Sequence, residues 1–428
     1  MYPEIAAAII LNRVEIEKRA LRDVAMEFFE EHSSLDYLKP IVRVLTLNTL
    51  RNYMFIDYLL EITGYRGGYR GMKKWLLRII TYELISGKKP KLSRINKIID
   101  KLSLSSSFVN DIKSLDPESI RRKLVKVNRI DIAYSMPKWI VSLLRKARIP
   151  NLEKFLESLL RDPVTWIRAS THRINVDALS KLLSNEGFSV KKDNVLPDCL
   201  KVLKGDRGKL AKVKLYELGY YVIQDKASIL VGHIVKPEDK VVLDLTCGAG
   251  LKTTHFAQLG AKKVIAQDIL YNKLVDASNL ASRLGLDNKI LFIVADSSVF
   301  IVHRDVKDVD IFVIDPPCSG IGRMALQPEL KIHLTPNDIK RYTRLQYRLL
   351  ESVIKRARRG AKILYSTCTV TIEENEDLVK FFEKEGFVEI LDQKPFIGSK
   401  SFYDPRIQRL YPHLHGTQGF TITYMEAI

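Results

Sequence analysis

The stretch 241–254 reads Val241-Val242-Leu243-Asp244-Leu245-Thr246-Cys247-Gly248-Ala249-Gly250-Leu251-Lys252-Thr253-Thr254. Its first five residues form an apolar run with an acid near the end, which predicts a buried parallel strand. The glycines that follow let the backbone approach a ligand closely, and a helix starting after them offers unpaired N–H groups. The turn is neither a P-loop nor the dinucleotide pattern G-x-G-x-x-G. Its D-x-x-x-G-x-G spacing, from Asp244 through Gly248 to Gly250, favours S-adenosylmethionine (SAM) as the ligand.

Acidic residues follow the next two predicted strands. The run 263–267 ends at Asp268, and the run 290–295 ends at Asp296. An acid after the second strand can accept hydrogen bonds from ribose hydroxyls, and one after the third can bind the amine of an adenine. Strand ends also carry solvated aspartates, so another Rossmann-like nucleotide-binding domain stays open as the alternative. Successive acids around one glycine turn nevertheless favour a SAM-dependent domain of α/β class.

The fourth and fifth predicted strands, 310–314 and 361–365, each lead into a cysteine. The fourth is followed by Asp315-Pro316-Pro317-Cys318-Ser319-Gly320 and the fifth by Ser366-Thr367-Cys368-Thr369. Consecutive prolines stiffen the first turn, and ligands of open α/β sheets bind at this edge of the sheet. A D-P-P-Y or D-P-P-F tetrapeptide would indicate methylation of an exocyclic amine, with the aromatic ring stacked on the base. Cys318 stands in that place, which argues against amine chemistry.

Two thiols at adjacent strand ends beside a methyl donor suit methylation of carbon 5 of cytosine. Carbon 5 is a poor nucleophile, but addition of a thiolate to carbon 6 makes an enamine whose carbon 5 attacks the methyl group. Loss of the carbon-5 proton and expulsion of the thiolate complete the cycle. The alternative is a set of inert core cysteines. Three of the four cysteines, Cys247, Cys318 and Cys368, nevertheless fall in predicted site loops.

The remaining sequence predicts two domains ahead of this one. Residues 1–135 carry apolar residues at three- and four-residue spacing and predict an all-helical domain. Residues 136–235 alternate short strands and helices, as in a small α+β module, and residues 236–428 repeat strand–helix units. The loop Tyr65-Arg66-Gly67-Gly68-Tyr69-Arg70-Gly71 predicts either a surface that stacks on bases and binds phosphates or a solvated interhelical connection.

The net charge of +19 is concentrated in the first half of the 428 residues. Residues 236–428 hold 27 lysines and arginines against 24 acids, and residues 1–235 hold 42 against 26. Such a basic region predicts a polyanionic partner, RNA or DNA, because binding neutralises phosphates and releases counterions. The alternative is a charged surface that serves solubility or thermal stability. No apolar stretch long enough to span a membrane, no secretory signal and no cysteine pairing pattern is evident, so we expect a cytoplasmic location.

Four motifs resemble those of the Sun-type (nucleolar-protein-related) RNA cytosine-C5 methyltransferase family. They occur in the family's order and are Gln224-Asp225-Lys226-Ala227-Ser228, Asp315-Pro316-Pro317-Cys318-Ser319-Gly320, Ser366-Thr367-Cys368-Thr369 with Glu373-Glu374-Asn375-Glu376, and Pro412-His413-Leu414-His415-Gly416-Thr417-Gln418-Gly419-Phe420. The resemblance implies that Cys368 is the nucleophile, that Cys318 assists release of the methylated base, and that Asp315 orients the cytosine edge. The long, irregular spacing of the four cysteines fits no C-x-x-C metal site, so we expect no metal. The residues implied to contact SAM are Thr246, Cys247, Gly248, Ala249, Gly250, Leu251, Lys252, Asp268, Asp296 and Asp315.

The first loop departs from the family's usual C-A-A-P-G-G-K-T. Here the proline is absent and Leu251 replaces a glycine, while Lys252 is kept and is implied to lie near both SAM and the base. Residues 136–235 are similar to the family's RNA-recognition-like subdomain, and residues 1–135 resemble the NusB-like RNA-binding domain of bacterial ribosomal-RNA members. These likenesses favour ribosomal RNA as the substrate, with transfer RNA as the alternative.

Two other functions compete with RNA methylation. A DNA cytosine-C5 methyltransferase would use a cysteine at the position of Cys318 and leave Cys368 idle. A catalytically weak RNA-binding assembly factor is favoured only by the altered first loop. Because the thiol must reach carbon 6, we expect the target cytosine to be single-stranded or flipped. The sequence predicts no oligomeric state.

Overall fold

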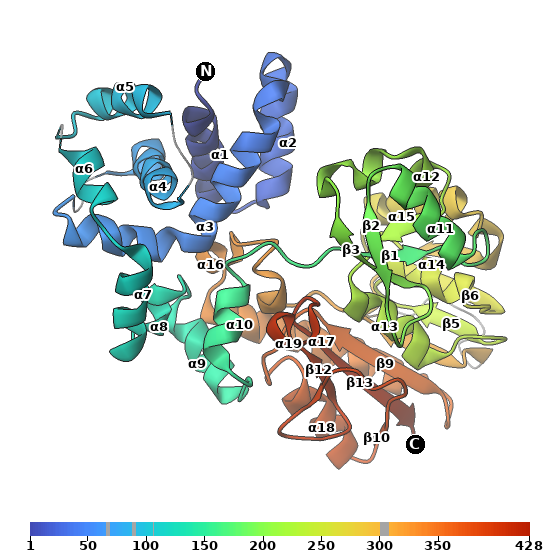
Figure 1. Cartoon of the computed structure of the whole chain (residues 1–428). Helices are drawn as coiled ribbons and strands as arrows, with labels where there is room; N and C mark the ends of the chain where they lie inside the picture. The colour runs from blue at the N-terminus through green and yellow to red at the C-terminus, as the bar shows by residue number, and fades with distance from the viewer. Residues whose placement is uncertain (66–68, 88–90, 106, 300–307) are drawn as a thin grey trace. The chain divides into compact units, whose positions relative to one another are not determined.

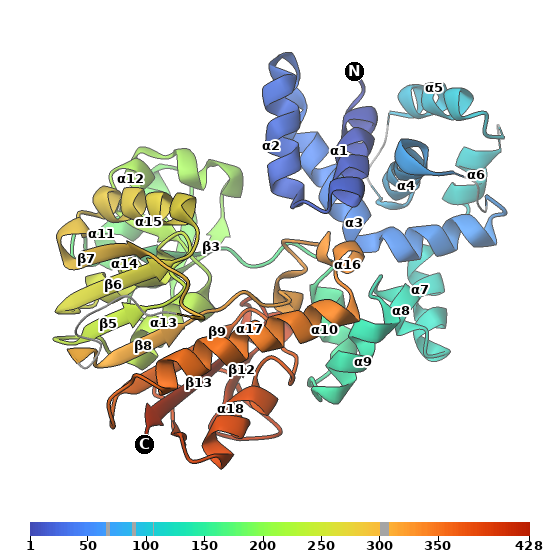
Figure 2. The same cartoon turned by 180° about the vertical axis from the view of Figure 1, so that it is seen from behind.

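The computed structural model describes residues 1–65, 69–87, 91–105, 107–299 and 308–428. The chain forms two compact units, Met1–Asp162 with Arg323–Thr335 and Pro163–Gly322 with Pro336–Ile428 (Figures 1 and 2). Among the described residues, no helix is both long enough and apolar enough to cross a bilayer. The predicted loop Tyr65–Gly71 includes residues 66–68, which lie outside the described residues.

The first unit is helical. Its α-helices are α1 (Pro3–Glu17), α2 (Leu21–Glu31), α3 (Lys39–Ile62), α4 (Gly71–Ile85), α5 (Leu92–Leu102), α6 (Phe108–Lys113), α7 (Pro117–Lys126), α8 (Ile130–Ala133), α9 (Lys138–Lys146), α10 (Leu152–Ser158) and α16 (Leu330–His333). Helix α1 packs against α3 and α4, because the fully buried run Ala6-Ala7-Ala8 lets their side chains, Trp75 among them, approach closely. The helical prediction for the N-terminal region is confirmed.

The helical unit also contains residues outside segment 1–135. Helices α9 and α10, expected at the start of the α+β module, belong to this unit by their packing. The unit also contains residues 323–335, which come from the middle of the predicted catalytic domain. Figure 1 shows α16 of this segment, coloured orange, together with helices coloured blue and teal. Packing joins segments that are distant in the chain, which local periodicity does not reveal.

Buried polar contacts fasten residues 323–335 to the helices. The Arg51 guanidinium on α3 donates to the Ala325 carbonyl at 3.0 and 2.6 Å. Lys331 Nζ donates in return to the Arg51 carbonyl at 2.9 Å, and the Glu329 carboxylate accepts from Leu21 N at 3.2 Å. Arg51, Glu329 and Lys331 are all buried. This segment is therefore an integral part of the helical unit.

The second unit begins with the predicted α+β module. Its elements are β1 (Trp166–Ala169), α11 (Val176–Asn185), β2 (Ser189–Lys192), β3 (Cys199–Lys204), α12 (Lys214–Glu217) and β4 (Tyr221–Ile223). The sheet has the order β2-β3-β1-β4 with antiparallel neighbours. Strand β1 is buried on both faces: Ile167 and Ala169 join the module's own core, and Trp166 joins the core of the methyltransferase sheet.

The methyltransferase sheet has the order β11-β12-β13-β9-β8-β5-β6-β7, with β10 paired to β13. Its elements are α13 (Lys226–Val235), β5 (Val241–Asp244), α14 (Leu251–Gln258), β6 (Lys263–Asp268), α15 (Tyr271–Leu284), β7 (Ile290–Val294), β8 (Ile311–Ile314), α17 (Pro336–Ile354), β9 (Lys362–Thr367), α18 (Glu376–Lys384), β10 (Val388–Leu391), β11 (Ser399–Lys400), β12 (Gln408–Leu410), α19 (Pro412–His415) and β13 (Phe420–Ala427). Strands β5, β6, β7, β8 and β9 are parallel to one another, and β13 runs antiparallel to β9. The predicted α/β class, with helical and α+β segments ahead of it, is confirmed.

Helices cover both faces of this sheet, so successive strand residues enter different cores. Val242 and Val313 join the cluster that includes α13, α14 and α15. Leu243 and Phe312 join the cluster that includes α17 and α18. This alternation explains why the strands read as continuous apolar runs.

The strand order reverses at β5. The chain passes from β5 to β6 and β7 on one side, and then to β8 and β9 on the other. Ligands of open α/β sheets bind outside the carboxyl ends of the strands at such a switch point. The loops after β5 and β8 meet there. They are the loops that carry the glycine turn and Cys318.

Candidate active site

The glycine turn after β5 has the geometry of a ligand-binding loop. Gly248 and Gly250 have φ of 53° and 79°, a left-handed conformation that disfavours side chains. The Asp268 carboxylate at the end of β6 accepts a hydrogen bond from Gly248 N at 2.9 Å and holds the turn. A Cβ on Gly250 would lie 2.8 Å from Cβ of Ala277 on α15, so that position also requires glycine. Gly250 caps α14, whose first turn points its N–H groups into the same region.

The acids at the strand ends differ in position. Asp244 is buried and accepts from Thr253 Oγ1 at 2.6 Å, so it supports the loop from inside. Burial raises the pKa of Asp244 to about 6. Asp268 is half-buried at the turn, whereas Asp296 is exposed and accepts from Ser298 N at 2.8 Å. Asp268 and Asp296 are therefore the strand-end acids that a ligand could reach.

Asp315 connects the first loop to the loop after β8. Its amide donates to Thr246 Oγ1 at 2.9 Å, and its carboxylate accepts from Ser366 Oγ at 3.3 Å. Lys252 Nζ forms an ion pair with the same carboxylate. Lys252 also lies 5.5 Å from the ring centre of Phe420, a cation–π contact. The structure thus gathers Thr246, Lys252 and Asp315 at one point of the sheet edge.

The two predicted catalytic cysteines lie side by side. Cys318 Sγ is 2.9 Å from Cys368 Sγ, and both residues are half-buried. The pKa of the Cys318 thiol is raised well above its ordinary value, first by its hydrogen bond with Cys368 and then by burial. Cys318 therefore keeps its proton while it contacts Cys368.

The other two cysteines are core residues. Cys199 and Cys247 are buried in the cluster beside α13 and α14. Burial raises the pKa of both thiols, which makes them poor nucleophiles. Cys247 therefore takes part in the glycine turn through its backbone, whose amide donates to the Gln267 carbonyl at 3.0 Å.

Glu374 ties the two cysteine loops together. Its fully buried carboxylate accepts from Ser319 N at 2.8 Å and from Ser319 Oγ at 2.6 Å, directly beside Cys318. It also accepts from Thr371 Oγ1 at 2.9 Å and from Gln346 Nε2 on α17 at 3.1 Å. Four donors on one carboxylate fix the loop after β9 against the loop after β8.

A second buried acid anchors the far side of the loop after β9. Glu376 pairs with Arg409 on β12, and both side chains are buried. Arg409 Nη1 also donates to the Val370 carbonyl at 2.6 Å. Asn375 accepts from Thr367 Oγ1 at 2.7 Å. The run Glu373–Glu376 thus positions the cysteine loop.

Two glycines, Gly322 and Gly419, allow the backbone segments around Cys368 to approach one another closely. Gly322 N donates to the Cys368 carbonyl at 3.1 Å, and Gly419 N donates to the Gly322 carbonyl at 2.9 Å. A Cβ on Gly322 would lie 1.9 Å from the Gly419 carbonyl oxygen. The motif 412–420 also meets the α+β module, since Trp166 Nε1 donates to the Gly416 carbonyl at 2.7 Å. Its glycines therefore serve close packing around Cys368.

Sequence reasoning missed some of these positioning residues. Glu374 and Gly419 lie in the quoted motifs without a role, and Gln346 and Gly322 lie outside them. An acid six residues after Cys368, among several threonines, is the signal that could have indicated Glu374. Gln346 gave no signal, because its partner is 28 residues away in the chain.

Two parts of the chain match known family models. Residues 233–426 match the model described as 16S rRNA methyltransferase RsmB/F. Residues 136–206 match the ferredoxin-like domain of RsmF/B-like methyltransferases. The second match covers α9 and α10 as well as the first three strands of the α+β module.

Curated relatives carry RNA methyltransferase names. The probable ribosomal RNA small subunit methyltransferase B of Bacillus subtilis is 26% identical, over 96% of this chain and 99% of the relative. The tRNA (cytosine(72)-C(5))-methyltransferase of Pyrococcus horikoshii is 34% identical, over 51% of this chain and 55% of the relative.

Solved structures share the fold. The crystal structure of PH0851 covers 100% of this chain and 99% of its own, with a TM-score of 0.78 at 20% identity, a likeness of fold alone. NSun6 from Pyrococcus horikoshii, solved with the SAM analogue SFG, has a TM-score of 0.56 at 25% identity. That match covers 64% of this chain and 93% of the other.

The fold, the glycine turn and the two family matches define the class of this protein. It is a SAM-dependent methyltransferase that acts on carbon 5 of cytosine in RNA. More specifically, the chain belongs to the RsmB/F family, also called the Sun or nucleolar-protein-related family.

Proposed function

We propose that the protein methylates a cytosine of ribosomal RNA, with Cys368 as the nucleophile and Cys318 as the group that assists product release. The observation that carries the proposal is the 2.9 Å contact between the two sulfur atoms. Carbons 5 and 6 are neighbours in the cytosine ring, so two adjacent thiols can act on both of them. The pairing suits the reaction, because one thiol is bonded to carbon 6 when the carbon-5 proton leaves and the other lies beside it to accept that proton.

The raised pKa of Cys318 supports this division of roles. Because Cys318 holds its proton while it contacts Cys368, we assign the attack to Cys368. Once Cys368 Sγ is bonded to carbon 6, it is no longer a thiolate that accepts the Cys318 hydrogen bond. The chief cause of the raised Cys318 pKa is then removed. Cys318 can release its proton to water and become a base.

The proposed cycle uses both thiols in order. The Cys368 thiolate bonds to carbon 6, and the electron pair moves toward carbon 5. SAM supplies the electrophilic methyl group for that carbon. The Cys318 thiolate then takes the carbon-5 proton, the bond from Cys368 to carbon 6 breaks, and Cys368 leaves as a thiolate. Asp315, paired with Lys252, is proposed to hold the amino edge of the cytosine during these steps.

The glycine turn fits SAM on structural grounds. A Cβ on Gly248 would meet open space, so glycine there keeps the backbone accessible to a ligand. Each carboxylate oxygen of Asp268 accepts one hydrogen bond, Oδ2 from Gly248 N and Oδ1 from Leu270 N. The remaining lone pairs can accept from ribose hydroxyls. The residues proposed to hold SAM are Thr246, Cys247, Gly248, Ala249, Gly250, Leu251, Lys252, Asp268, Asp296 and Asp315.

Two alternatives receive less support. The altered first loop, which favoured an assembly factor without catalysis, still has a positive φ at both glycines and a capped α14. Leu251, at the position of the missing glycine, packs against the core as part of α14. A DNA methyltransferase that uses Cys318 alone would give Cys368 no role, although the two sulfur atoms are in contact.

The choice of ribosomal RNA rests on the extent of likeness. The relative named for small-subunit ribosomal RNA matches 96% of this chain, helical region included, whereas the relative named for transfer RNA matches 51%. The proposed target is a single-stranded or flipped cytosine, because the thiol must reach carbon 6 outside a base stack. The proposed location is the cytoplasm.

Methylcytosine mapping tests the proposal. Total RNA from cells with and without the gene is treated with bisulfite and sequenced. We expect one ribosomal RNA cytosine to lose its methyl group, and an unmodified transcript of that region to regain it with the purified protein and SAM. Loss confined to transfer RNA would contradict the substrate, and no loss in either RNA would contradict the proposed activity.

A further inference from the structure

Helix α14 presents one face, which carries several hydrogen-bonding groups, to the α+β module. Leu251, Thr254, His255 and Gln258 recur at the spacing of a single helix face. Each of the four contacts Arg168, Ala169 or Asp198 of the module. Leu251 does so through its carbonyl and the others through their side chains. The same helix begins directly after the glycine turn. The face that meets the module is therefore rigidly connected to the residues proposed to hold SAM.

Arg168 makes the contacts nearest that turn. It lies on β1 and is fully buried. Its Nη1 donates to the Leu251 carbonyl and to Gln224 Oε1, both at 2.7 Å, and its Nη2 donates to Thr254 Oγ1 at 3.1 Å. Leu251 is the first residue of α14, next to Gly250. One guanidinium thus holds the first turn of the helix from outside.

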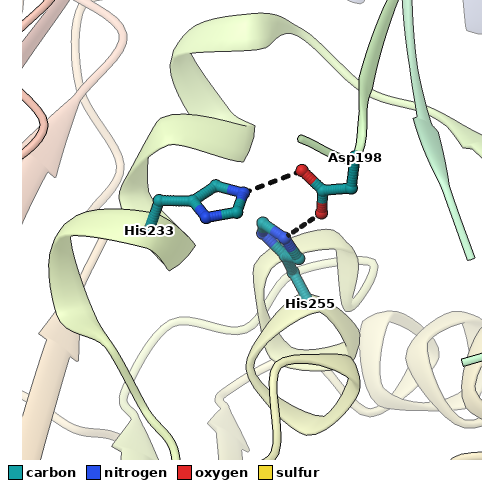
Figure 3. A group of neighbouring side chains, drawn as sticks. All are labelled: Asp198, His233 and His255. Carbon is teal, nitrogen blue, oxygen red and sulfur yellow. Dashed lines mark hydrogen bonds and ion pairs between the residues drawn. The ribbon is translucent and has the colours of Figure 1, made fainter. Parts of the chain in front are cut away.

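A buried cluster balances the charge of Arg168. Figure 3 shows the Asp198 carboxylate between two imidazoles, with His233 Nε2 at 2.7 Å from one oxygen and His255 Nε2 at 2.8 Å from the other. Burial alone would raise the pKa of Asp198, but its contacts with His255 and His233 outweigh burial and lower that pKa. Burial lowers the pKa of His255 to about 4 and that of Arg168 to about 9. At neutral pH, Arg168 and Asp198 are therefore charged and His255 is neutral.

The same three side chains have the composition of a metal site, with ligand atoms within 4.8 Å of one another. Each imidazole Nε2, however, already meets an Asp198 oxygen at hydrogen-bond distance. His255 Nδ1 has no partner among the described residues, whereas a metal-bound histidine ordinarily donates from its second nitrogen. The nearby Arg168 charge also disfavours a dication. These observations favour a hydrogen-bonded cluster.

We propose that Arg168 is a positioning residue for methyl transfer, which fixes the start of α14 and with it the glycine turn for SAM. Asp198, held by His233 and His255, supplies the buried counter-charge that keeps the guanidinium in place. The α+β module, which resembles an RNA-recognition fold, thereby also tunes the cofactor loop. This inference rests on the proposed use of that loop for SAM.

The test compares SAM binding in variants of full-length protein. Arg168→Met removes the donors, and Arg168→Lys restores part of them. Thr254→Val removes the acceptor of Arg168 Nη2, and with it the hydrogen bond from Thr254 Oγ1 to the Gly250 carbonyl, with little change of shape. We expect the SAM Kd, measured by calorimetry, to rise about tenfold for Arg168→Met and about threefold for Arg168→Lys and for Thr254→Val, because only part of the hold on the turn is lost in the last two. RNA affinity and kcat at saturating SAM should stay within about twofold. In a Cys318→Ala background, the yield of protein–RNA adduct should not change.

Two reference variants separate the possible failures. Arg207, an exposed arginine of the same module that donates to the Pro163 carbonyl, serves as the matched control, and Arg207→Met should leave the SAM Kd unchanged. Asp268→Asn should weaken SAM binding if the glycine turn is the SAM site. An unchanged Kd for Asp268→Asn would overturn the proposed site itself. A different result would overturn only the role of Arg168. In that case Asp268→Asn binds SAM more weakly, while Arg168→Lys and Thr254→Val fold and keep the wild-type Kd for SAM.

Metal analysis of the purified protein closes the remaining alternative. We expect less than about 0.1 zinc per chain and a SAM Kd that EDTA does not alter. If the wild-type protein holds about one metal ion per chain and the Asp198→Asn variant does not, the role of Asp198 as the counter-charge is overturned. If Arg168→Met does not fold, as judged by its thermal melt, the Arg168→Lys and Thr254→Val variants still decide the proposal.

Discussion

Cys318 Sγ lies 2.9 Å from Cys368 Sγ, although the two residues are 50 positions apart in the chain. The contact arises because β8 and β9 are parallel neighbours whose carboxyl ends lie at one edge of the sheet. It is the geometric basis for assigning attack to one thiol and release to the other.

Replacing each thiol should have a different effect. Cys368→Ala should abolish both methylation and the covalent protein–RNA adduct, because no thiolate reaches carbon 6. Cys318→Ala should block turnover but accumulate the adduct, because release fails. Denaturing gel electrophoresis of protein incubated with radiolabelled RNA and SAM measures both. An adduct in Cys368→Ala but not in Cys318→Ala would reverse the assignment.

Glu374 should be required for the geometry of the thiols although it touches neither. Glu374→Ala removes the buried acceptor of Ser319 N and Thr371 Oγ1 and one of the two acceptors of Gln346 Nε2, so we expect the free energy of unfolding to fall by about 3 kcal/mol. Displacement of the loop should lower kcat about 100-fold. Urea denaturation and single-turnover methylation measure these changes. Glu385→Gln, at an exposed position nearby in sequence, is the control, and an equal loss there would refute a specific role for Glu374.

Protonation of the buried Lys331 should lower the free energy of unfolding of the helical unit as the pH falls. Burial lowers its pKa from 10.5 to about 7, so the stability tied to neutral Lys331 is present above 10.5 and is lost as the pH falls through 7. Lys331→Met should therefore raise the free energy of unfolding by about 3 kcal/mol at pH 6, and lower it by about 1 kcal/mol at pH 10.5, where only the lost hydrogen bond to the Arg51 carbonyl counts. Chemical denaturation across this range measures the difference. Parallel pH profiles for the two proteins would contradict the prediction.

RNA binding should depend steeply on salt. If four phosphates are neutralised, the affinity for unmodified RNA should fall about 100-fold between roughly 50 and 200 mM salt. Filter binding measures the slope. Replacing Arg122, Lys123 and Lys126, exposed on α7, by glutamine should reduce that slope and leave the SAM Kd unchanged. An unchanged slope would exclude α7 from the RNA-binding surface.

These substitutions test the helical unit better than a truncation does. Removing residues 1–135 would strip residues 323–335 of the helices that bury Glu329 and Lys331. The truncated chain would then expose buried charged groups. Its loss of activity would therefore not be specific to RNA binding.

The local features of the methyltransferase domain were predictable because neighbouring residues encode them. Apolar runs gave the parallel strands, and the spacing of Asp244, Gly248 and Gly250 gave the turn. The prediction that Cys318 and Cys368 lie close together followed from strand ends meeting at one edge. The antiparallel strands β10 to β13 were not assigned, because their pairing with β9 and with one another depends on distant residues.

The sequence by itself determined the α/β class, the SAM-type turn and the pair of thiols, since each is written in a few adjacent residues. Only the tertiary structure decided which groups hold them. Glu374 meets Ser319 across 55 residues, and Arg168 meets Leu251 across 83. It also decided that residues 323–335 pack with the helices of the first unit. Such partners are set by burial and hydrogen bonding in the folded chain, and a buried polar group leaves no periodic pattern along the sequence.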